Sequence, residues 1–584
     1  MKLVIIGHRG VGKSTLAKRL KEYFQMQNHK ISIYDLDAEI VSQNKKTIDQ
    51  IFFSHGESHF RKLERSTFDQ LRGEDDVVII AGAGFEPRET AGLEFLWVQR
   101  PTDEQGRIFT DRPRLDSGVT PLREFLSRFK EREKKYASLS HEVLILGEGF
   151  DFSNSAEEKY FTSQVKEVGG IWTVFARHLD RLREKLSWGI DLFELRDDLL
   201  SQSEIVQALE ILPNDKVLIS FRETERISQT RTLVEKLNFK FDWPVDYPKC
   251  DWANPFIISL HGDDTSQILR AESDFPQALI KWACDTNNFH ALMLGHAWQK
   301  ENPERRSFLP MSQKGIWKWY RLWNSQPLSF FRIDRGSAAD QPSLLERLRQ
   351  NEFINPKNFA AVLGDPVLHS RSPAEHFDFF KKQDKPFYAV QVMASEFQFA
   401  LAALEELGLT EAAVTSPLKE LAFQNSQPNQ LSILEIAATN TLILNRSKQW
   451  IGTNTDIEGV KAIAKGIPHL DEKSVAIWGG GGTLGVLKKV FPNALYYSSR
   501  TGEPRSPIDR LPKILIWAVG RKNFDQAKVF PPSEWPIEMI IDLNYSEDSP
   551  GRECALRYGC PYISGLEMFR VQAQAQRQFW SQFS

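Results

Sequence analysis

Short apolar runs alternate with charged, amphipathic stretches through roughly the first 150 residues of the chain. Four runs have the length of buried strands, and the stretches between them have helical spacing. This alternation predicts a parallel sheet with helices on its faces. A polar stretch at 147–158 is typical of a linker. The four runs are Leu3–Ile6, Ile31–Tyr34, Val77–Ile80 and Phe95–Val98.

Eight further apolar runs follow in the middle of the chain. Eight strand candidates in series predict a (β/α)8 barrel. They are Trp172–Ala176, Leu192–Leu195, Val217–Phe221, Phe239–Val245, Phe256–Leu260, Leu279–Ala283, Phe308–Met311 and Leu328–Ile333.

A second polar stretch, 349–357, precedes a third block of strands and helices. There the apolar run Val475–Trp478 leads into four glycines and a helical pattern, which is typical of a dinucleotide-binding fold. We therefore expect an α/β protein of three domains. Their expected bounds are 1–160, 165–350 and 355–584, the last with a substrate part at about 355–460 plus the C-terminal helix and a Rossmann part at about 470–560.

Composition and charge argue against some classes of partner and compartment. The 584 residues suffice for about three or four domains. A net charge of −3 without long runs of one sign argues against nucleic-acid and membrane partners. The four cysteines form no CxxC pair, and the N-terminus lacks a signal-like segment, so we expect a reducing cytoplasm. Small-molecule ligands fit best, and the oligomeric state stays open, a homodimer included.

A phosphate-binding motif follows the first strand. Residues Gly7–Ser14 fit GxxxxGK[ST] between a strand and a helical pattern. Backbone N–H groups of such a loop face phosphates, Lys13 reaches the outer phosphates, and Ser14 can hold Mg²⁺. The motif predicts that this domain uses ATP or a close relative. The loop residues expected at the nucleotide are Gly10, Gly12, Lys13, Ser14 and Thr15.

Asp35 and Asp37 follow the next strand and are either a solvated turn or a pair of metal-side and substrate-side carboxylates. With the glycines and arginines further on, the order of motifs resembles shikimate kinase across about 150 residues, except that Ala83 replaces a usual glycine. The resemblance implies that Asp35 supports Mg²⁺ and that Asp37 holds a substrate hydroxyl. It further implies carboxylate binding by Arg61 and Arg132, ring contacts from Gly82 and Gly84, and a lid residue, Arg112, on ATP.

Polar residues end successive strand candidates of the middle block, where barrel enzymes keep their chemistry. Lys281 lies between Ile280 and Trp282. A buried lysine there is costly unless it is paired or neutral, and such a lysine can act as a Schiff-base nucleophile. The alternative is a lysine on a solvent-facing side of the strand.

This block is similar to type I 3-dehydroquinate dehydratase. The similarity implies that Lys281 forms an imine with the substrate ketone and that His261 is the general acid/base. The connection 246–256 is too short for a full helix, so either the barrel has lost a helix or the activity is impaired. The similarity also implies that Glu194 assists His261, that Arg196, Arg222 and Arg321 serve the substrate ring and carboxylate, and that Gln341 lies in a covering loop.

Five separated motifs in the third block resemble shikimate dehydrogenase over about 225 residues. The resemblance makes Lys419 and Asp456 the catalytic pair, the alternative being a structural ion pair. Arg500, after the next strand, suits a 2′-phosphate and hence NADP(H). Expected substrate contacts are Ser370, Ser372, Thr415, Asn440 and Gln572. Expected cofactor contacts are Gly479, Gly481, Gly482, Ser499, Arg500 and Thr501.

The three resemblances describe consecutive steps of the shikimate pathway, in the order of the last three domains of the pentafunctional arom family. We expect a multifunctional enzyme that uses ATP, Mg²⁺ and NADP(H). Two alternatives stay open: a non-catalytic regulator of the same order, similar to the quinate-pathway repressors, or an active kinase and dehydrogenase around an impaired barrel. Retention of Lys13, Lys281 and Lys419 favours the enzyme.

Overall fold

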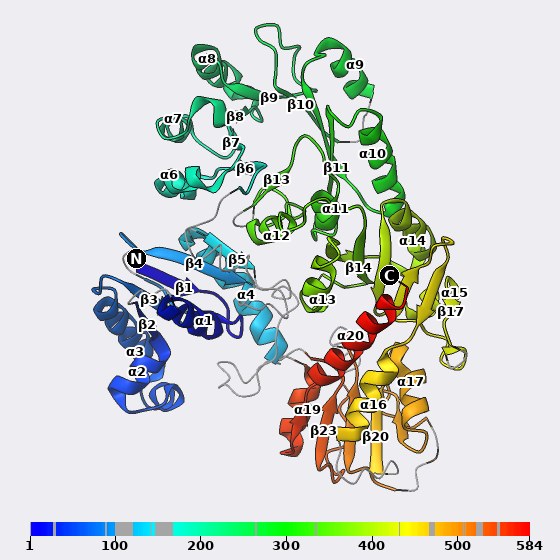
Figure 1. The fold of residues 1–584 in the computed structure, drawn as a ribbon. Coiled ribbons are helices and arrows are strands. Elements are labelled where there is room, and N and C mark those ends of the chain that lie inside the picture. The colour runs from blue at the N-terminus through cyan, green and yellow to red at the C-terminus, as the bar shows by residue number, and fades with distance from the viewer. Residues whose placement is uncertain are drawn as a thin grey trace.

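The computed structural model contains four β-sheets within the residues that it describes (Figure 1). None of its described helices is long and apolar enough to cross a membrane. The expected lid residue Arg112 and the expected linker at 147–158 lie outside the described residues. Those residues are 2–26, 31–87, 90–99, 121–140, 142–145, 167–262, 266–332, 336–368, 370–430, 433–466, 474–505, 507, 510–520, 529–545 and 549–583.

The N-terminal sheet has five parallel strands in the order β2-β3-β1-β4-β5. Its central strand β1 is apolar on both faces because helices cover both sides, as the alternating pattern predicted. The strands are β1 Lys2–Ile6, β2 Ser32–Asp35, β3 Val77–Ile80, β4 Glu94–Gln99 and β5 Glu142–Ile145. The helices are α1 Lys13–Met26, α2 Leu36–Asn44, α3 Ile48–Leu71 and α4 Pro121–Leu139.

The middle sheet has eight parallel strands in chain order, and its last strand, β13, pairs with its first, β6. Each of the eight apolar runs overlaps one of these strands, with bounds that differ by up to three residues. Among the described residues, no backbone hydrogen bonds pair β12 with β13. The Leu328 amide, just before β13, instead donates to Ser307 Oγ of β12 at 3.0 Å. The strands are β6 Ile171–Thr173, β7 Leu192–Arg196, β8 Val217–Ser220, β9 Lys240–Pro244, β10 Ile257–His261, β11 Leu279–Asp285, β12 Arg306–Met311 and β13 Phe330–Phe331.

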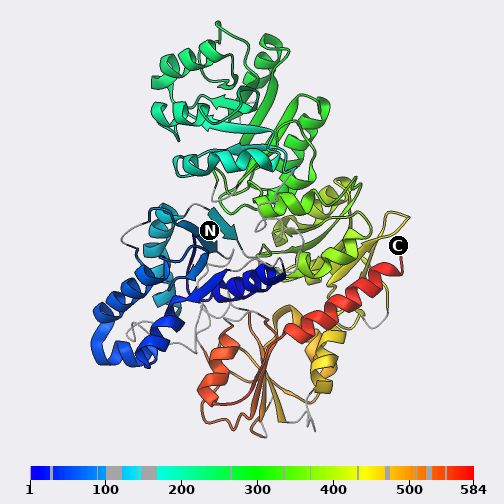
Figure 2. The same ribbon diagram turned by 60° about the vertical axis from the view of Figure 1, so that its left-hand side comes forward.

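Helices follow most strands of this sheet (Figure 2). The connection 245–256 between β9 and β10 contains only turns and irregular backbone, in agreement with its short length. The helices are α6 Leu182–Lys185, α7 Gln202–Leu209, α8 Ile227–Leu237, α9 Ser266–Asp274, α10 Phe289–Glu301, α11 Lys318–Trp323 and α12 Leu344–Gln350.

The C-terminal part has two sheets joined by long helices. A mixed sheet has the order β15-β14-β16-β18-β19-β17, and a parallel sheet has the order β21-β20-β22-β23-β24. The strands are β14 Phe359–Gly364, β15 Phe387–Gln391, β16 Leu409–Val414, β17 Gln427–Pro428, β18 Thr441–Leu444, β19 Trp450–Thr453, β20 Val475–Gly479, β21 Leu495–Tyr497, β22 Ile514–Ala518, β23 Met539–Asp542 and β24 Tyr562–Ile563. The helices are α13 Ser372–Lys381, α14 Phe397–Glu406, α15 Lys419–Gln424, α16 Asp456–Gly466, α17 Leu484–Val490, α19 Pro550–Tyr558 and α20 Leu566–Ser581.

Helices α16 and α20 pack side by side, and α20 runs from the parallel sheet back to the mixed sheet (Figure 1). Strand β20 lies between β21 and β22, which the chain reaches in opposite directions. The glycine turn that leaves β20 therefore lies at a topological switch point, where open α/β sheets bind ligands.

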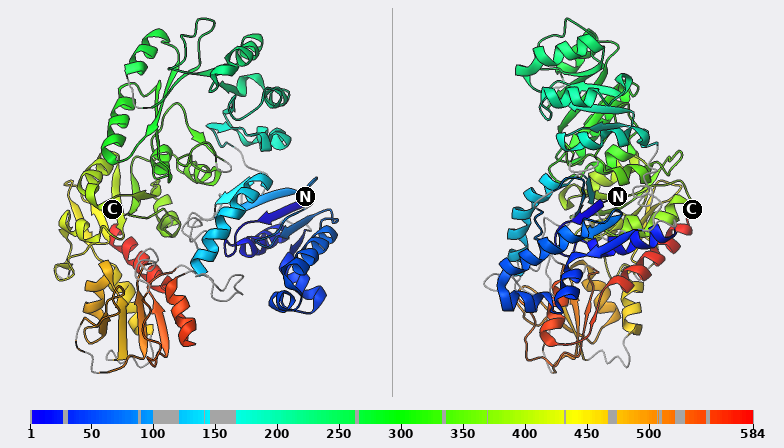
Figure 3. Two further views of the ribbon diagram at one scale, coloured as in Figure 1. Left: turned by 180° about the vertical axis from the view of Figure 1, so that it is seen from behind. Right: turned by 90° about the vertical axis from the view of Figure 1, so that its left-hand side faces the viewer.

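The eight-stranded sheet and the mixed sheet lie next to each other (Figure 3). They share one hydrophobic core. Trp319 and Trp323 of α11 lie against Phe359 of β14, with ring centroids 5.7 and 5.0 Å away. Trp323 Nε1 also donates to the Leu407 carbonyl (2.8 Å). These contacts join the eight-stranded sheet to the mixed sheet.

Candidate active sites

The phosphate-binding loop connects β1 to α1 in a conformation that needs glycine. Gly7, Gly10 and Gly12 have φ of 148°, 71° and 104°. A side chain at Gly7 would strike the carbonyl of Val98 on β4. Lys13 Nζ donates to the carbonyls of Gly7 (2.8 Å) and His8 (3.0 Å), so its ammonium group lies over the loop. A cradle without side chains beside an ammonium group fits the phosphates of a nucleotide.

The two predicted metal-side residues lie together. Ser14 Oγ donates to Asp35 Oδ2 at 3.0 Å, while Asp35 Oδ1 accepts from the Asp37 amide and caps α2. A hydroxyl and a carboxylate beside the phosphate cradle are the hard oxygen donors that Mg²⁺ prefers. Asp37 itself lies beside Gly82: a β-carbon there would be 3.3 Å from Asp37 Oδ1.

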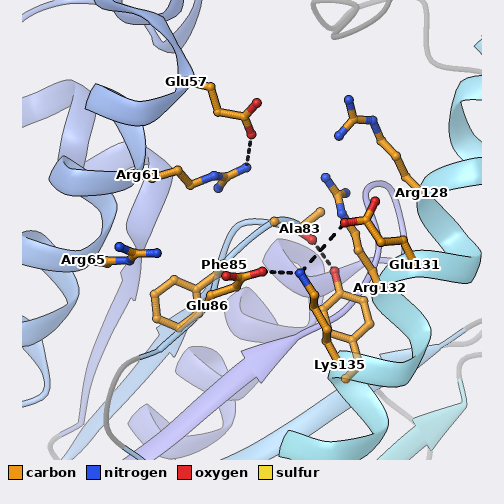
Figure 4. Close-up of a pocket in the computed structure, with 12 residues that line it drawn as sticks. Glu57, Arg61, Arg65, Ala83, Phe85, Glu86, Arg128, Glu131, Arg132 and Lys135 are labelled. Atoms are coloured by element: carbon orange, nitrogen blue, oxygen red, sulfur yellow. Dashed lines mark hydrogen bonds and ion pairs between the residues drawn. The ribbon is translucent and has the colours of Figure 1, made fainter.

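A pocket of about 160 Å³ opens between α3, α4 and the turn after β3 (Figure 4). Arg61 from α3 and Arg132 from α4 approach it from opposite sides (Figure 4). Arg61 is ion-paired with Glu57 (3.1 Å) and Glu64 (2.6 Å). Burial and the neighbouring cations lower the pKa of Arg132. The pocket is lined by Glu57, Arg61, Arg65, Ala83, Gly84, Phe85, Glu86, Arg128, Glu131, Arg132, Lys135 and Tyr136.

The four arginines that line the pocket fit a small anion, because planar guanidinium groups bind carboxylates bidentately. Gly84 lies against Arg61, and a β-carbon there would overlap the guanidinium group. Tyr136 donates to the carbonyl of Ala83, so the residue that replaces a glycine contributes its backbone. The structure thus brings together Arg61, Arg132 and Gly84, and Glu64, the partner of Arg61, lies beside Gly82 and Asp37.

Lys281 lies inside the eight-stranded sheet and not on a solvent-facing side. It is 3% exposed and is ion-paired with Asp242, which is 0% exposed. Arg222 Nη2 contacts the same oxygen, Asp242 Oδ2, at 2.5 Å. Burial, followed by the charge of Arg222, lowers the pKa of Lys281 although Asp242 opposes this. Burial raises the pKa of Asp242, but the two cations outweigh it and hold that pKa well below its ordinary range.

Other predicted residues surround this group. Glu194 accepts hydrogen bonds from Thr173 Oγ1 (2.5 Å) and Ser220 Oγ (2.8 Å). His261 ends β10 at an exposed position. Its surroundings lower its pKa, through desolvation first and then through Lys281 and Arg222. A neutral imidazole beside an amine can accept a proton. Arg196 forms a two-point ion pair with Asp198 (2.9 and 2.6 Å).

Two predicted substrate contacts of this region form hydrogen bonds within the chain. Arg321 is 7% exposed and donates to the Pro310 carbonyl from Nε (3.0 Å) and Nη2 (2.8 Å). Burial lowers its pKa to about 10. Gln341 Nε2 donates to Ser337 Oγ at 3.1 Å. Sequence reasoning missed Asp242, although a single acidic residue inside the apolar run Phe239–Val245 is a signal for a buried partner.

The predicted pair of the C-terminal part is formed. Lys419 Nζ lies 2.5 Å from Asp456 Oδ2, and Asn440 Nδ2 donates to Asp456 Oδ1 at 2.8 Å. Lys419 begins helix α15, which follows β16, and Asp456 begins helix α16, which follows β19. Both charges therefore lie just beyond strands of the mixed sheet. Asp456 is 1% exposed and Asn440 is 0% exposed. This buried carboxylate therefore has a donor on each oxygen.

The glycine turn after β20 lies against Lys419. Gly479, Gly480 and Gly481 have φ of 96°, 123° and 44°. A β-carbon on Gly482 would lie 4.0 Å from Lys419 Cδ. The turn thus fits a dinucleotide whose reactive end meets the Lys419–Asp456 pair. At the end of β21, Ser498 Oγ accepts from the amides of Arg500 (3.3 Å) and Thr501 (3.4 Å) in an exposed turn that includes Ser499.

The predicted substrate contacts lie beside the strands of the mixed sheet and on α20. Ser370 Oγ donates to Ser372 Oγ at 3.2 Å at the start of α13. Thr415 lies beside Gly364, where a β-carbon would overlap its methyl group. Gln572 is partly exposed on α20. Sequence reasoning missed Gln576, one turn further along the same helix, which is bonded to Asn440 and is 2% exposed.

Comparisons with known proteins agree with two of the three parts. Residues 9–149 match the family model described as "Shikimate kinase", and residues 362–442 match "Shikimate dehydrogenase substrate binding domain". The chain therefore contains a shikimate kinase domain and a shikimate dehydrogenase domain. Neither of these two models covers the eight-stranded sheet.

Three curated relatives are each similar to a part of the chain. The chain is 28% identical to "Shikimate dehydrogenase (NADP(+))" of Prochlorococcus marinus (strain MIT 9301) over 27% of its length. It is 27% identical to "Shikimate biosynthesis protein AroDE" of Chlamydia pneumoniae over 42%. It is 32% identical to "Bifunctional shikimate kinase/3-dehydroquinate synthase" of Thermotoga maritima over 22%. The chain spans 55%, 54% and 27% of the lengths of these relatives, respectively.

Proposed function

We propose that this chain is a multifunctional enzyme of the shikimate pathway. It dehydrates 3-dehydroquinate, reduces 3-dehydroshikimate to shikimate, and phosphorylates shikimate. The observation that carries the proposal is the buried Lys419–Asp456 pair at 2.5 Å with the glycine turn of a dinucleotide fold against it. The cofactors are NADP(H) for the reduction and ATP with Mg²⁺ for the phosphorylation, in keeping with the two domain families.

For the reduction, bound NADPH supplies a hydride to the ketone carbon. Lys419 donates a proton to the ketone oxygen, so a hydroxyl group forms. Asp456 holds the Lys419 ammonium group in place, and Asn440 holds Asp456. Ser370, Ser372, Thr415 and Gln572 bind the substrate hydroxyls and carboxylate from the lobe that faces the glycine turn.

For the phosphorylation, the glycine cradle and Lys13 hold the phosphates of ATP, and Ser14 with Asp35 holds Mg²⁺. Asp37 orients the shikimate hydroxyl and takes its proton. Arg61 and Arg132 bind the shikimate carboxylate. Catalysis consists mainly of positioning and neutralisation of charge, because phosphoryl transfer needs little covalent help from the protein.

For the dehydration, the Lys281 amine adds to the substrate ketone, whose oxygen leaves as water, so an imine forms. His261 takes a proton from the adjacent carbon and returns it to the departing hydroxyl group, which leaves as a second water. Water then hydrolyses the imine and regenerates Lys281. The buried position of Lys281 and its lowered pKa support this role, since only the neutral amine is nucleophilic.

A second candidate keeps the eight-stranded sheet mainly as a scaffold for the dehydrogenase. Two observations favour it. The guanidinium group of Arg321 donates hydrogen bonds to backbone carbonyls of β12, and helix α11 packs against the mixed sheet. Under this alternative the kinase and dehydrogenase are active and the dehydratase is impaired.

One set of assays on the purified chain tests these proposals separately. The chain receives 3-dehydroquinate alone, then 3-dehydroshikimate with NADPH, then shikimate with ATP and Mg²⁺. We expect 3-dehydroshikimate, NADPH oxidation and shikimate 3-phosphate, respectively. Failure of the first assay alone favours the scaffold candidate, and failure of all three refutes the enzyme.

A further inference from the structure

We propose that Gln576 is a positioning residue for the reduction, acting through Thr441 and Asn440 on Asp456. Gln576 touches neither Lys419 nor Asp456 in the structure. It comes from the C-terminal helix α20, and a series of hydrogen bonds connects it to the pair. The inference rests on the proposed dehydrogenase function.

The amide of Asn440 has only one orientation that satisfies its neighbours. Asn440 Oδ1 accepts from the Thr455 amide (2.8 Å) and from Thr441 Oγ1 (2.8 Å). The backbone N–H can only donate, so the atom that faces it is the oxygen. Asn440 Nδ2 is therefore the atom that donates to Asp456 Oδ1 at 2.8 Å.

The next bond has a defined direction too. The Thr441 hydroxyl has one proton, which it gives to Asn440 Oδ1, so its oxygen is left to accept. Gln576 Nε2 donates to Thr441 Oγ1 (3.2 Å) and to the Asn440 carbonyl (3.3 Å). Thr441 and Asn440 are 0% exposed and Gln576 is 2% exposed. Gln576 thus holds both the backbone of Asn440 and the hydroxyl that orients its amide.

The orientation of Gln576 is set at its other end. Arg577 Nη1 lies 3.4 Å from His376 Nδ1, and an arginine can only donate, so this nitrogen carries no proton. Burial and Arg577 lower the pKa of His376 to about 3, so the ring is neutral and its proton is on Nε2. His376 Nε2 then donates to Gln576 Oε1 at 3.1 Å. The order Arg577, His376, Gln576, Thr441, Asn440, Asp456 therefore runs in one direction from donor to acceptor.

This relay connects the placement of α20 to the orientation of the Asp456 carboxylate. Oxygen Oδ1 is occupied by the Asn440 amide, which leaves Oδ2 to Lys419. If Gln576 cannot donate, Thr441 loses the bond that keeps its hydroxyl directed at Asn440, and the carboxylate loses a fixed partner. Small misplacements of catalytic groups reduce turnover far more than they reduce substrate binding.

The central test is Gln576→Leu, which nearly keeps the volume and removes all three hydrogen bonds of the Gln576 amide. The control is Gln578→Leu, which changes an exposed glutamine of the same helix. For Gln576→Leu we expect kcat of NADPH oxidation to fall about tenfold to a hundredfold. We expect KM for 3-dehydroshikimate to change less than about threefold, because the substrate contacts remain. The rate of shikimate phosphorylation is the internal standard and stays constant in both variants.

Two further variants separate positioning from folding. Gln576→Glu preserves shape but cannot donate to the Asn440 carbonyl, so it should be as slow as the leucine variant. In Thr441→Val the relay is already broken, so adding Gln576→Leu should lower kcat little further. Equal kcat in Gln576→Leu and wild type, or additive losses in the double variant, would overturn the relay.

An inactive wild type would instead refute the proposed dehydrogenase. The relay is then decided by the crystal structure of the Gln576→Leu variant. An Asn440 amide that still contacts Asp456 overturns the relay, and a rotated amide supports it.

Discussion

Lys281 and Asp242 form an ion pair inside the eight-stranded sheet, where neither residue is more than 3% exposed. Charges in such a place are stable only together, because each would otherwise lack water. Arg222 shares the same carboxylate oxygen, so a single negative charge serves two cations. The amine is consequently easier to deprotonate than an ordinary lysine, which suits a nucleophile.

Reduction with borohydride in the presence of 3-dehydroquinate should attach the substrate covalently to Lys281. The rate of attachment should rise with pH, because deprotonation gives the reactive amine, and the lowered pKa makes the rise begin below that of ordinary lysines. Mass spectrometry of the peptide that contains Lys281 measures the adduct. Lys281→Met is the control and should give none; absence of the adduct in the wild type would contradict an imine mechanism.

Asp242→Asn should destabilise the chain at pH 7 by about 3 kcal/mol, since it leaves Arg222 and Lys281 without their counter-charge. The folded pKa of Asp242 is lowered, so its contribution is complete above its unfolded pKa of about 4 and is lost as pH falls through the folded value. The difference from wild type should shrink correspondingly in acid. Urea unfolding at several pH values checks this, with the exposed Asp246→Asn as a control that should change little.

Lys419→Ala should lower NADPH oxidation with 3-dehydroshikimate by about a thousandfold, because the proton donor to the ketone oxygen is lost. Phosphorylation of added shikimate should be unaffected, since it uses the N-terminal sheet. Lys382→Ala removes an exposed lysine of the same lobe and serves as the control. A small effect of Lys419→Ala would mean that the pair with Asp456 is structural.

Gly84→Ala should displace Arg61, because the new β-carbon overlaps the guanidinium group. We expect KM for shikimate to rise at least about tenfold, the loss of one charged hydrogen bond, while KM for ATP stays constant. Initial rates with each substrate varied in turn measure this. Gly73→Ala, at an exposed position after α3, is the control. An unchanged KM for shikimate would remove Arg61 from the carboxylate site.

Trp323→Ala should destabilise the eight-stranded sheet and the mixed sheet together, by about 2–3 kcal/mol, since the partly buried indole packs against their shared core. Hydrogen exchange should speed up in both regions and stay constant in β1 and β4 of the kinase domain. Leu294→Ala, at a side chain exposed on α10, is the control. Faster exchange in one region alone would argue against a shared core.

The strands were largely predictable because buried parallel strands are continuous apolar runs, and each of the eight middle runs overlaps a strand. The nucleotide loop and the Lys419–Asp456 pair were predictable because local motifs specify them. Long-range partners were not: Asp242 reaches Lys281 across strands, and Gln576 reaches Asn440 from a helix 136 positions away. The environment of Arg321 was not predictable either, since helix α11 directs its side chain toward the backbone of β12, which the local sequence does not reveal.

The tryptophans of α11 have an evolutionary consequence. If the proposed dehydration were no longer needed, the eight-stranded sheet could still not be deleted without harm. Deletion would expose Phe359 and its neighbours and leave an aggregation-prone apolar surface on the dehydrogenase. Selection for solubility would preserve the sheet while the groups proposed for dehydration, such as Lys281, changed. In descendants of this chain, we expect Trp319 and Trp323 to outlast Lys281.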